Sequence, residues 1–146
     1  MYGLNLITMS KYNIIEKKER EAPYRMALRP ELVDELYEKI QQRLVMDKKY
    51  RDPYYSAKKL AEDLNTNTRY ISAVVSLRYQ QNYASLVNEL RIRDAMYMLI
   101  DGRYADKRVE DIALMVGFAN RQSFYSAFYK LKGMTPREFR MKHVKE

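Results

Sequence analysis

Polar side chains that can form hydrogen bonds in several directions cluster in residues 117–136, GFANRQSFYSAFYKLKGMTP. Arg121 carries a forked set of donors, Gln122 both donates and accepts, and Ser123 and Ser126 add hydroxyl groups. Aromatic residues alternate with them at helical spacing. This combination predicts a helix with one apolar face for the core and one polar face that binds a partner.

Two stretches of the chain contain no Asp or Glu, although nearly a third of all residues are charged. One runs from residue 64 to 88 and the other from 112 to 137, and both contain basic residues. A carboxylate in either place would repel a negatively charged partner. We therefore expect both stretches to lie against phosphate groups.

The residues that catalysis and metal binding usually need are scarce. The chain has no Cys, and its one His is His143, close to the C-terminus. Disulfides and thiolate metal sites are thus excluded, and metal, triad and thiol chemistry have no cluster of residues to use. We expect a protein that is not an enzyme and that needs no metal or other cofactor.

Composition describes a folded, basic domain. Hydrophobic residues make up 47% of the 146, which is too many for a disordered chain, and the net charge of +8 favours nucleic acid first and an anionic membrane surface second. Residues 105–146 hold nine basic and five acidic residues, and so half of the excess charge. No apolar run is long enough for a membrane span or a secretion signal, and we expect a cytoplasmic protein.

Few Gly and Pro interrupt the chain, and long segments repeat apolar residues near the helical period. The sequence predicts an all-α protein without a convincing strand. Ser56 can cap one helix, Ser85 another, and Thr135, Pro136 and Glu138 form a capping box for the last. The expected segments are a helix from Pro30 to about 44, helices within 56–79, a long helix at about 85–101, helices within 109–132 and a closing helix at about 136–143.

The short helices form a repeat. Ala61 and Ala113 are separated by 52 residues, and so are Asn65 and Gly117. Asn and Gly most easily adopt the left-handed backbone of a sharp turn, and the small Ala lets two helices cross closely. Each repeat is therefore predicted to be a helix-turn-helix, at about 56–79 and 109–132, with the long helix joining them.

These residues resemble the DNA-binding domain of the AraC/XylS family of bacterial transcription regulators over about residues 28–143. The resemblance is strongest in IALMVGFANRQSFYSAFYKLKGMTPREFR, and LAEDLNTNTRYIS and RIRDAMYML also resemble the family. It implies a homeodomain-like, AraC-type fold, with residues 28–146 as the DNA-binding domain and 1–27 as an N-terminal extension or linker. Family members usually carry a large sensing or dimerisation domain, and the short segment before Met26 cannot form one.

Two positions depart from the family pattern. Tyr129 occupies the place of a Lys in the second recognition helix, and the first recognition helix is followed by RYQQNY without the usual Gly. The first departure removes an expected phosphate contact or replaces it with a phenol hydroxyl.

Helical geometry and the resemblance together assign the contact residues. Taking Ile71 and Phe124 as inward and advancing 100° per residue turns one polar face of each recognition helix outward. The inward faces should form the core, which we expect to contain Phe118, Phe124, Phe128 and Leu131. The expected base contacts are Arg69, Ser72, Ala73, Ser76, Arg121, Gln122, Ser123, Tyr125 and Ser126. The expected phosphate contacts are Thr68, Arg78, Lys107, Arg108, Asn120, Tyr129, Lys130 and Lys132.

The sequence thus predicts a transcription regulator that binds specific double-stranded DNA with two recognition helices in successive major-groove segments, as an activator or a repressor. Two alternatives stay open. The domain could act mainly through a protein partner such as RNA polymerase or another regulator, or it could bind nucleic acid without sequence preference. An upstream sensing domain or a dimerisation partner is also compatible with the sequence.

Overall fold

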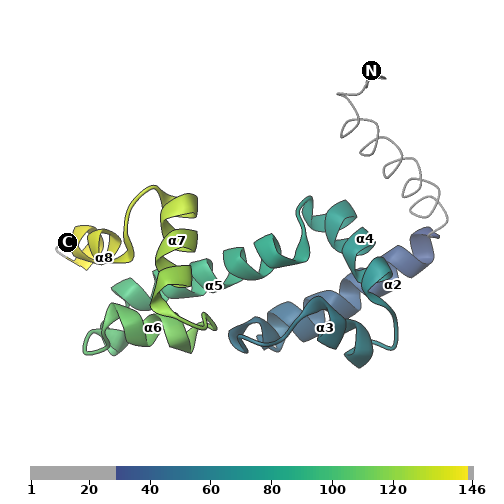
Figure 1. Cartoon of the computed structure of the whole chain (residues 1–146), viewed down its shortest axis with the longest axis horizontal. Helices are drawn as coiled ribbons and strands as arrows, with labels where there is room; N and C mark the ends of the chain where they lie inside the picture. Colours follow the sequence, from purple (N-terminus) through teal and green to yellow (C-terminus); the bar gives the residue numbers. More distant parts are fainter. Residues whose placement is uncertain (1–28, 145–146) are drawn as a thin grey trace, which may run out of the picture. The chain divides into compact units, whose positions relative to one another are not determined.

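The computed structural model describes residues 29–144, and within that range the chain is helical and contains no strand. The chain divides into a unit at residues 1–36 and a larger unit at residues 37–146. The extension expected at residues 1–27 lies outside the described residues. The helices, labelled in Figure 1, are α2 (Pro30–Ile40), α3 (Ala57–Asp63), α4 (Thr68–Tyr79), α5 (Tyr83–Ile100), α6 (Val109–Met115), α7 (Arg121–Lys132) and α8 (Pro136–Val144).

Helix α2 begins at Pro30, as expected, because the fixed φ of proline suits the first turn, where no N–H donor is needed. It continues into a π-helical turn at Gln41–Met46. Ile40 and Leu44 are completely buried along this segment. Short 3-10 turns follow at Lys49–Arg51 and, later, at Gly102–Tyr104.

Helices α3 and α4 form the first helix-turn-helix. Ser56 caps α3 by accepting a hydrogen bond from the N–H of Lys59. The turn passes through Asn65, whose φ of 57° is left-handed, as expected. The N–H of Thr66 then donates to the carbonyl of Ala61 at 2.9 Å, which ties the turn back to α3. Local bonds therefore fix the turn that joins the two helices.

Helices α6 and α7 repeat this geometry. Gly117 has a φ of 114°, and the N–H of Phe118 donates to the carbonyl of Ala113 at 3.0 Å. The sequence prediction of two matching left-handed turns is confirmed at Asn65 and Gly117. The second motif has one extra residue between the turn and the following helix, because α4 is capped by Asn67, two residues after Asn65, and α7 by Asn120, three residues after Gly117.

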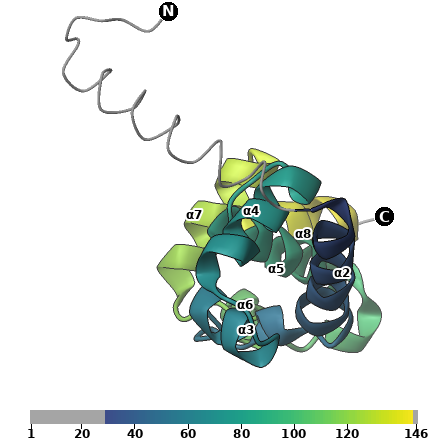
Figure 2. The same ribbon diagram turned by 90° about the vertical axis from the view of Figure 1, so that its right-hand side faces the viewer.

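Helix α5 joins the two helix-turn-helix motifs. It begins at Tyr83, before the expected start near residue 85, because Asn82 rather than Ser85 is the N-cap and accepts a hydrogen bond from the N–H of Ser85. Helix α5 contacts α4, and it also contacts α6, α7 and α8, which surround its C-terminal half in Figures 1 and 2. It thus serves as the common support of both α4 and α7.

A polar cluster connects the middle of α5 to the turn around Tyr50. Asp94 accepts hydrogen bonds from the Tyr50 hydroxyl and from Nε of Arg51, both at 2.7 Å. Arg91 donates from Nε to the Tyr50 carbonyl at 2.7 Å, and its guanidinium lies 5.5 Å from the centre of the Phe118 ring. The cluster therefore bonds α5 to the chain before the first helix-turn-helix and touches the turn of the second.

The core of the second helix-turn-helix is aromatic. The Phe124 and Phe128 rings are 5.7 Å apart and completely buried, and Phe118 is nearly so. Leu131 was expected to join them, but its side chain is 48% exposed. The expectation was wrong because Leu131 lies in the last turn of α7, next to the C-cap Gly133.

Helix α8 closes the core from the C-terminal side. The expected capping box forms, since Glu138 accepts from the N–H of Thr135 at 2.9 Å and the Thr135 hydroxyl accepts from the N–H of Glu138 at 3.1 Å. Arg140 donates to the carbonyls of Leu99 and Tyr104, each at 3.0 Å. These bonds satisfy carbonyl groups at the end of α5 and in the following 3-10 turn.

Candidate nucleic-acid interface

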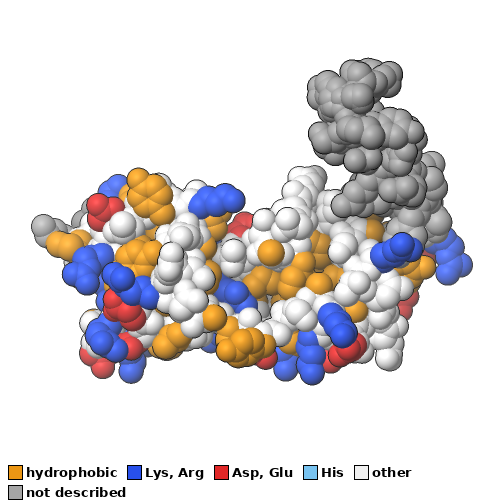
Figure 3. All heavy atoms as spheres, viewed as in Figure 1, with side chains coloured by type: hydrophobic (Ala, Val, Ile, Leu, Met, Phe, Trp, Pro, Cys, Tyr) orange, Lys and Arg blue, Asp and Glu red, His pale blue; other side chains and the backbone are white. Residues whose placement is uncertain are grey.

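The outward face of α7 carries the polar residues that the sequence singled out. Arg121, Gln122, Ser123 and Ser126 are exposed. Uncharged side chains cover most of the visible surface over α7 in Figure 3. Two open hollows of about 480 Å³ each border this face, and both are lined in part by Asn120 and Gln122. The surface offers hydrogen-bond donors and acceptors in a recess, without a carboxylate of its own.

Tyr125 has a mixed environment. It is half-buried and packs against the aromatic core, with its ring centre 6.0 Å from that of Phe124. Its other side supports Arg121, whose guanidinium carbon lies 4.4 Å from the ring centre. Nε of Arg121 also donates to Oε2 of Glu110 at 3.1 Å. Arg121 is therefore held between an aromatic ring and a carboxylate.

The electrostatics of this contact favour the ionised forms of both Glu110 and Arg121. A backbone hydrogen bond and the nearby Arg121 guanidinium hold the pKa of Glu110 below its ordinary value. Hydrogen bonding with Tyr125 and the charge of Glu110 raise the pKa of Arg121. Glu110 lies in the first turn of α6, where the helix dipole stabilises a negative charge.

The outward face of α4 differs in part from the expectation. Arg69 and Ser72 are exposed, and Ser76 is half-buried. Ala73 was expected to face outward, but it is only 6% exposed. A methyl group so covered offers almost no surface to a base, so Ala73 is not a proposed base contact. Burial on α4 thus extends beyond the face that a uniform 100° step from Ile71 defines.

The residues expected to contact phosphate are all exposed, and several already have structural bonds. The Asn120 side chain accepts from the N–H of Ser123 at 2.8 Å as the cap of α7. Arg108 forms an ion pair with Asp111 at 3.1 Å. The Arg78 guanidinium lies 5.0 Å from the centre of the Tyr37 ring. The exposed set is Thr68, Arg78, Lys107, Arg108, Asn120, Tyr129, Lys130 and Lys132.

The helix caps show a division of charge. Helices α4, α5 and α7 are each capped by an Asn and have no acidic residue in the first turn. Helices α6 and α8 instead have acids in the first turn, among them Glu110 and Glu138. Asp would cap α4 and α7 as well as Asn does, so stability alone does not account for a neutral cap. With an uncharged cap, the positive ends of α4 and α7 have no carboxylate at the cap or in the first turn.

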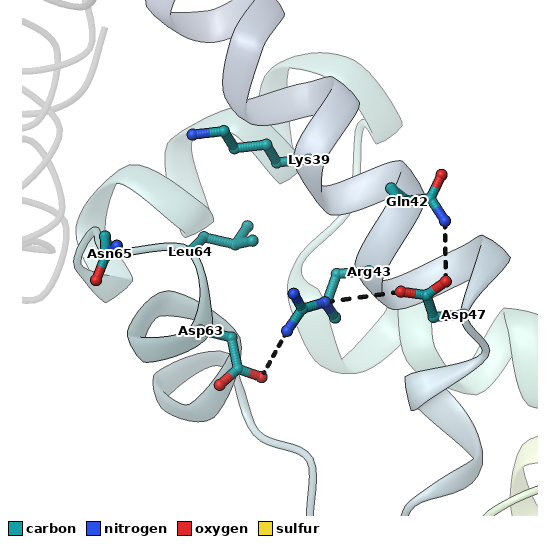
Figure 4. A pocket seen from close by; sticks show the side chains of 7 residues that line it. All are labelled: Lys39, Gln42, Arg43, Asp47, Asp63, Leu64 and Asn65. Atoms are coloured by element: carbon teal, nitrogen blue, oxygen red, sulfur yellow. Dashed lines mark hydrogen bonds and ion pairs between the residues drawn. The ribbon is translucent and has the colours of Figure 1, made fainter.

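Another hollow, of about 290 Å³, lies beside the first helix-turn-helix and is shown in Figure 4. Its charged groups bond to each other: Arg43 pairs with Asp63 at 3.3 Å and with Asp47 at 3.7 Å, and Gln42 donates to Asp47 at 2.9 Å.

Among residues 29–144 there is no group of acidic, His or Cys side chains placed to hold a metal ion. Nor does the described part of the chain include a helix with the length and apolarity of a membrane span.

Sequence reasoning missed two residues at α7. Asn88 of α5 lines the same hollow as Gln122 and Ser126, although it is distant in sequence. Glu110 contacts Arg121 from α6. Periodicity within one helix gives no signal for Asn88 or Glu110, because each lies on a different helix from the residues it adjoins. The repeat predicts that the helices pack together but not which polar side chains meet.

Comparison with known proteins identifies the fold and the family. A family model described as a helix-turn-helix domain matches residues 60–142. The melibiose operon regulatory protein of Escherichia coli is 32% identical over 81 residues, which cover 56% of this chain and 26% of that protein. The chain therefore aligns with only about a quarter of its curated relative.

Two solved structures share the fold. The C-terminal domain of AraT, a response regulator from Geobacillus stearothermophilus, is 23% identical with a TM-score of 0.63, over 80% of this chain and 88% of that chain. The C-terminal domain of the two-component response regulator yesN from Fusobacterium nucleatum is also 23% identical, with a TM-score of 0.64 over 73% and 98%. The matched family is one of regulator DNA-binding domains and not of enzymes. With its paired turns, its two helix-turn-helix motifs and this match, the chain belongs to the AraC-type family of helix-turn-helix DNA-binding domains.

Proposed function

We propose that this domain binds double-stranded DNA with sequence preference and serves a transcription regulator, with α4 and α7 entering successive major-groove segments. The observation that carries the proposal is the outward face of α7, where Arg121, Gln122, Ser123 and Ser126 are exposed around a recess without an acid of its own. Arg and Gln are the side chains that make bidentate contacts to guanine and adenine in the major groove. Arg69 and Ser72 on α4 supply the second reading surface.

The length of α5 supports a long binding site. Its 18 residues span about 27 Å as an α-helix. Two major-groove segments on one face of DNA are about 34 Å apart, so a modest bend in the DNA would let both recognition helices enter. Since α4 and α7 differ in sequence, the site should be asymmetric rather than palindromic.

Further partners belong to the same proposal. A cytoplasmic location would follow from contact with bacterial DNA, and the similarity to the melibiose operon regulatory protein supports a role in regulation. RNA polymerase is a proposed partner. A sensing or dimerisation domain is another, because only 26% of the curated relative aligns with this chain.

Binding-site selection from a random DNA pool, followed by affinity measurement at fixed salt, tests the proposal. Arg69→Ala and Gln122→Ala should each cost about 1–3 kcal/mol on the selected duplex and relax the preference at one base pair. Arg93→Ala is a control for a lost positive charge, because Arg93 lies on α5 and pairs there with Glu89 at 2.9 Å. Equal losses on selected and shuffled DNA would contradict direct base recognition.

The salt dependence separates phosphate contacts from base contacts. Lys132→Ala should weaken binding to every sequence and lower the salt slope by about one unit. An unchanged slope would remove Lys132 from the phosphate contacts. Uniform, salt-sensitive binding by the unaltered protein would favour a nonspecific nucleic-acid binder, and absence of DNA binding would favour a protein partner.

A further inference from the structure

The contact between Glu110 and Arg121 places a carboxylate beside a surface that otherwise excludes acids. Helix α7 contains none, yet Glu110 reaches from α6 to bond Nε of Arg121 at 3.1 Å. The Glu110 side chain is 35% exposed and that of Arg121 60% exposed, so water reaches both. A solvated ion pair of this kind contributes little to folding. Its position at the start of the recognition helix points to a different role.

The geometry around Arg121 restricts what the guanidinium can do. Tyr125 lies one helical turn along α7 and stacks at 4.4 Å, while Glu110 takes the Nε hydrogen bond. A guanidinium carries five N–H donors, and the bond to Glu110 uses Nε rather than the forked terminal nitrogens. Those terminal nitrogens are the ones that make parallel bonds to a guanine edge. Because Tyr125 and Glu110 already order Arg121, this side chain loses less conformational entropy when it binds a base.

We infer that Glu110 is a positioning residue for DNA specificity: it holds Arg121 in orientation for a base edge and repels DNA phosphates from the Arg121 guanidinium. The inference rests on the proposed function of α7. A phosphate can bind the terminal nitrogens of Arg121 along any DNA sequence, but its negative charge is repelled by the nearby Glu110 carboxylate, whereas a guanine edge carries no net charge. A base contact through the terminal nitrogens leaves the ion pair intact. Glu110 thus lowers affinity for random DNA more than for the correct site.

The test compares the affinity ratio between the selected duplex and a shuffled duplex for the whole chain. Glu110→Gln keeps the shape and removes the charge. It should raise affinity for shuffled DNA and lower the ratio by roughly fivefold or more, since one bidentate base contact accounts for discrimination of that size. Glu62→Gln is the control, because Glu62 is an exposed acid on α3, outside the helix pair that carries Arg121. It makes the same change in net charge and should leave the ratio unchanged.

A second variant distinguishes positioning from general electrostatics. In an Arg121→Ala background, Glu110→Gln should no longer change the ratio, whereas a purely long-range charge effect would persist. Equal ratios for the unaltered protein and Glu110→Gln, with specificity intact, would overturn the inference and leave the proposed function standing. No preference for any selected duplex by the unaltered protein would overturn both.

Discussion

Replacing Gly117 with Ala should destabilise the second helix-turn-helix more than the same change at any other described glycine. Gly117 has a φ of 114°, which L side chains rarely adopt. A Cβ atom there would lie 2.5 Å from the Tyr50 carbonyl oxygen, 2.8 Å from Nε of Arg91 and 2.9 Å from the carbonyl carbon of Arg51. Two of these three atoms are backbone, so a side-chain rotation does not relieve the contacts.

The expected magnitude combines two costs. A non-glycine residue in an unfavourable region of backbone space costs about 1–3 kcal/mol. Forcing an extra methyl group into a packed site costs about 1–3 kcal/mol more. Together they give a loss of about 2–6 kcal/mol in the free energy of unfolding, which is a large fraction of the roughly 5–15 kcal/mol of an ordinary domain.

Urea unfolding followed by circular dichroism measures this loss, and two other glycines provide matched controls. Gly133→Ala meets no atom within 4 Å but has a φ of 72°, so it should show the backbone cost alone, about 1–2 kcal/mol. Gly102→Ala meets no atom within 4 Å and has no left-handed φ, and it should change stability by less than about 1 kcal/mol in either direction. If Gly117→Ala lost no more than Gly133→Ala, the contacts with the Tyr50 turn would not be tight, and the reasoning would fail.

Three further predictions concern the end of α4 and the residues packed around α5. Gln80 has a φ of 59° at the position where the second helix-turn-helix has Gly133. Gln80→Gly should therefore stabilise the protein by about 0.5–1 kcal/mol, and a lower urea midpoint would contradict this. Asp94→Asn should cost about 1–3 kcal/mol, measured in the same way, because it weakens the hydrogen bonds from Tyr50 and Arg51; a loss no larger than that of an exposed Asp→Asn change would argue against the cluster. Burial, and for Tyr50 also the Asp94 carboxylate, raises the pKa of Tyr50 and Tyr83 from 10.0 to about 12. The two tyrosines should therefore contribute fully to stability below pH 10, and this contribution should decline as the pH rises through 12. Their ionisation should appear as a late step in the tyrosinate absorbance of a pH titration, and Tyr50→Phe should reduce that step.

Much of the fold followed from local chemistry. The left-handed turns at Asn65 and Gly117 and the capping box at Thr135 depend on residues a few positions apart, so the sequence was enough to predict them. The core was predictable where apolar spacing was regular, as at Phe124 and Phe128. The start of α5 was misplaced because Asn82 and Ser85 are both good caps, and only the packed helix selects between them.

The errors at Ala73, an expected base contact, and at Leu131, an expected core residue, came from contacts between helices. Ala73 and Leu131 were assigned from a uniform helical step, which ignores how far a neighbouring helix extends over each turn. Ala73 is covered at 6% exposure, whereas Leu131 is 48% exposed near the end of α7. Periodicity gives the direction of a side chain relative to its own axis, and burial also depends on the partner helix.

The sequence by itself determined that this chain is an all-helical, basic domain with two helix-turn-helix units and two acid-free stretches, because composition, caps and turn residues act locally. Only the tertiary structure decided which polar groups meet. Arg91, Tyr50 and Asp94 join around α5, and Glu110 meets Arg121 across the second helix pair. These pairs are far apart in the chain or lie on different helices, and their contact depends on crossing angles that packing of the whole core sets.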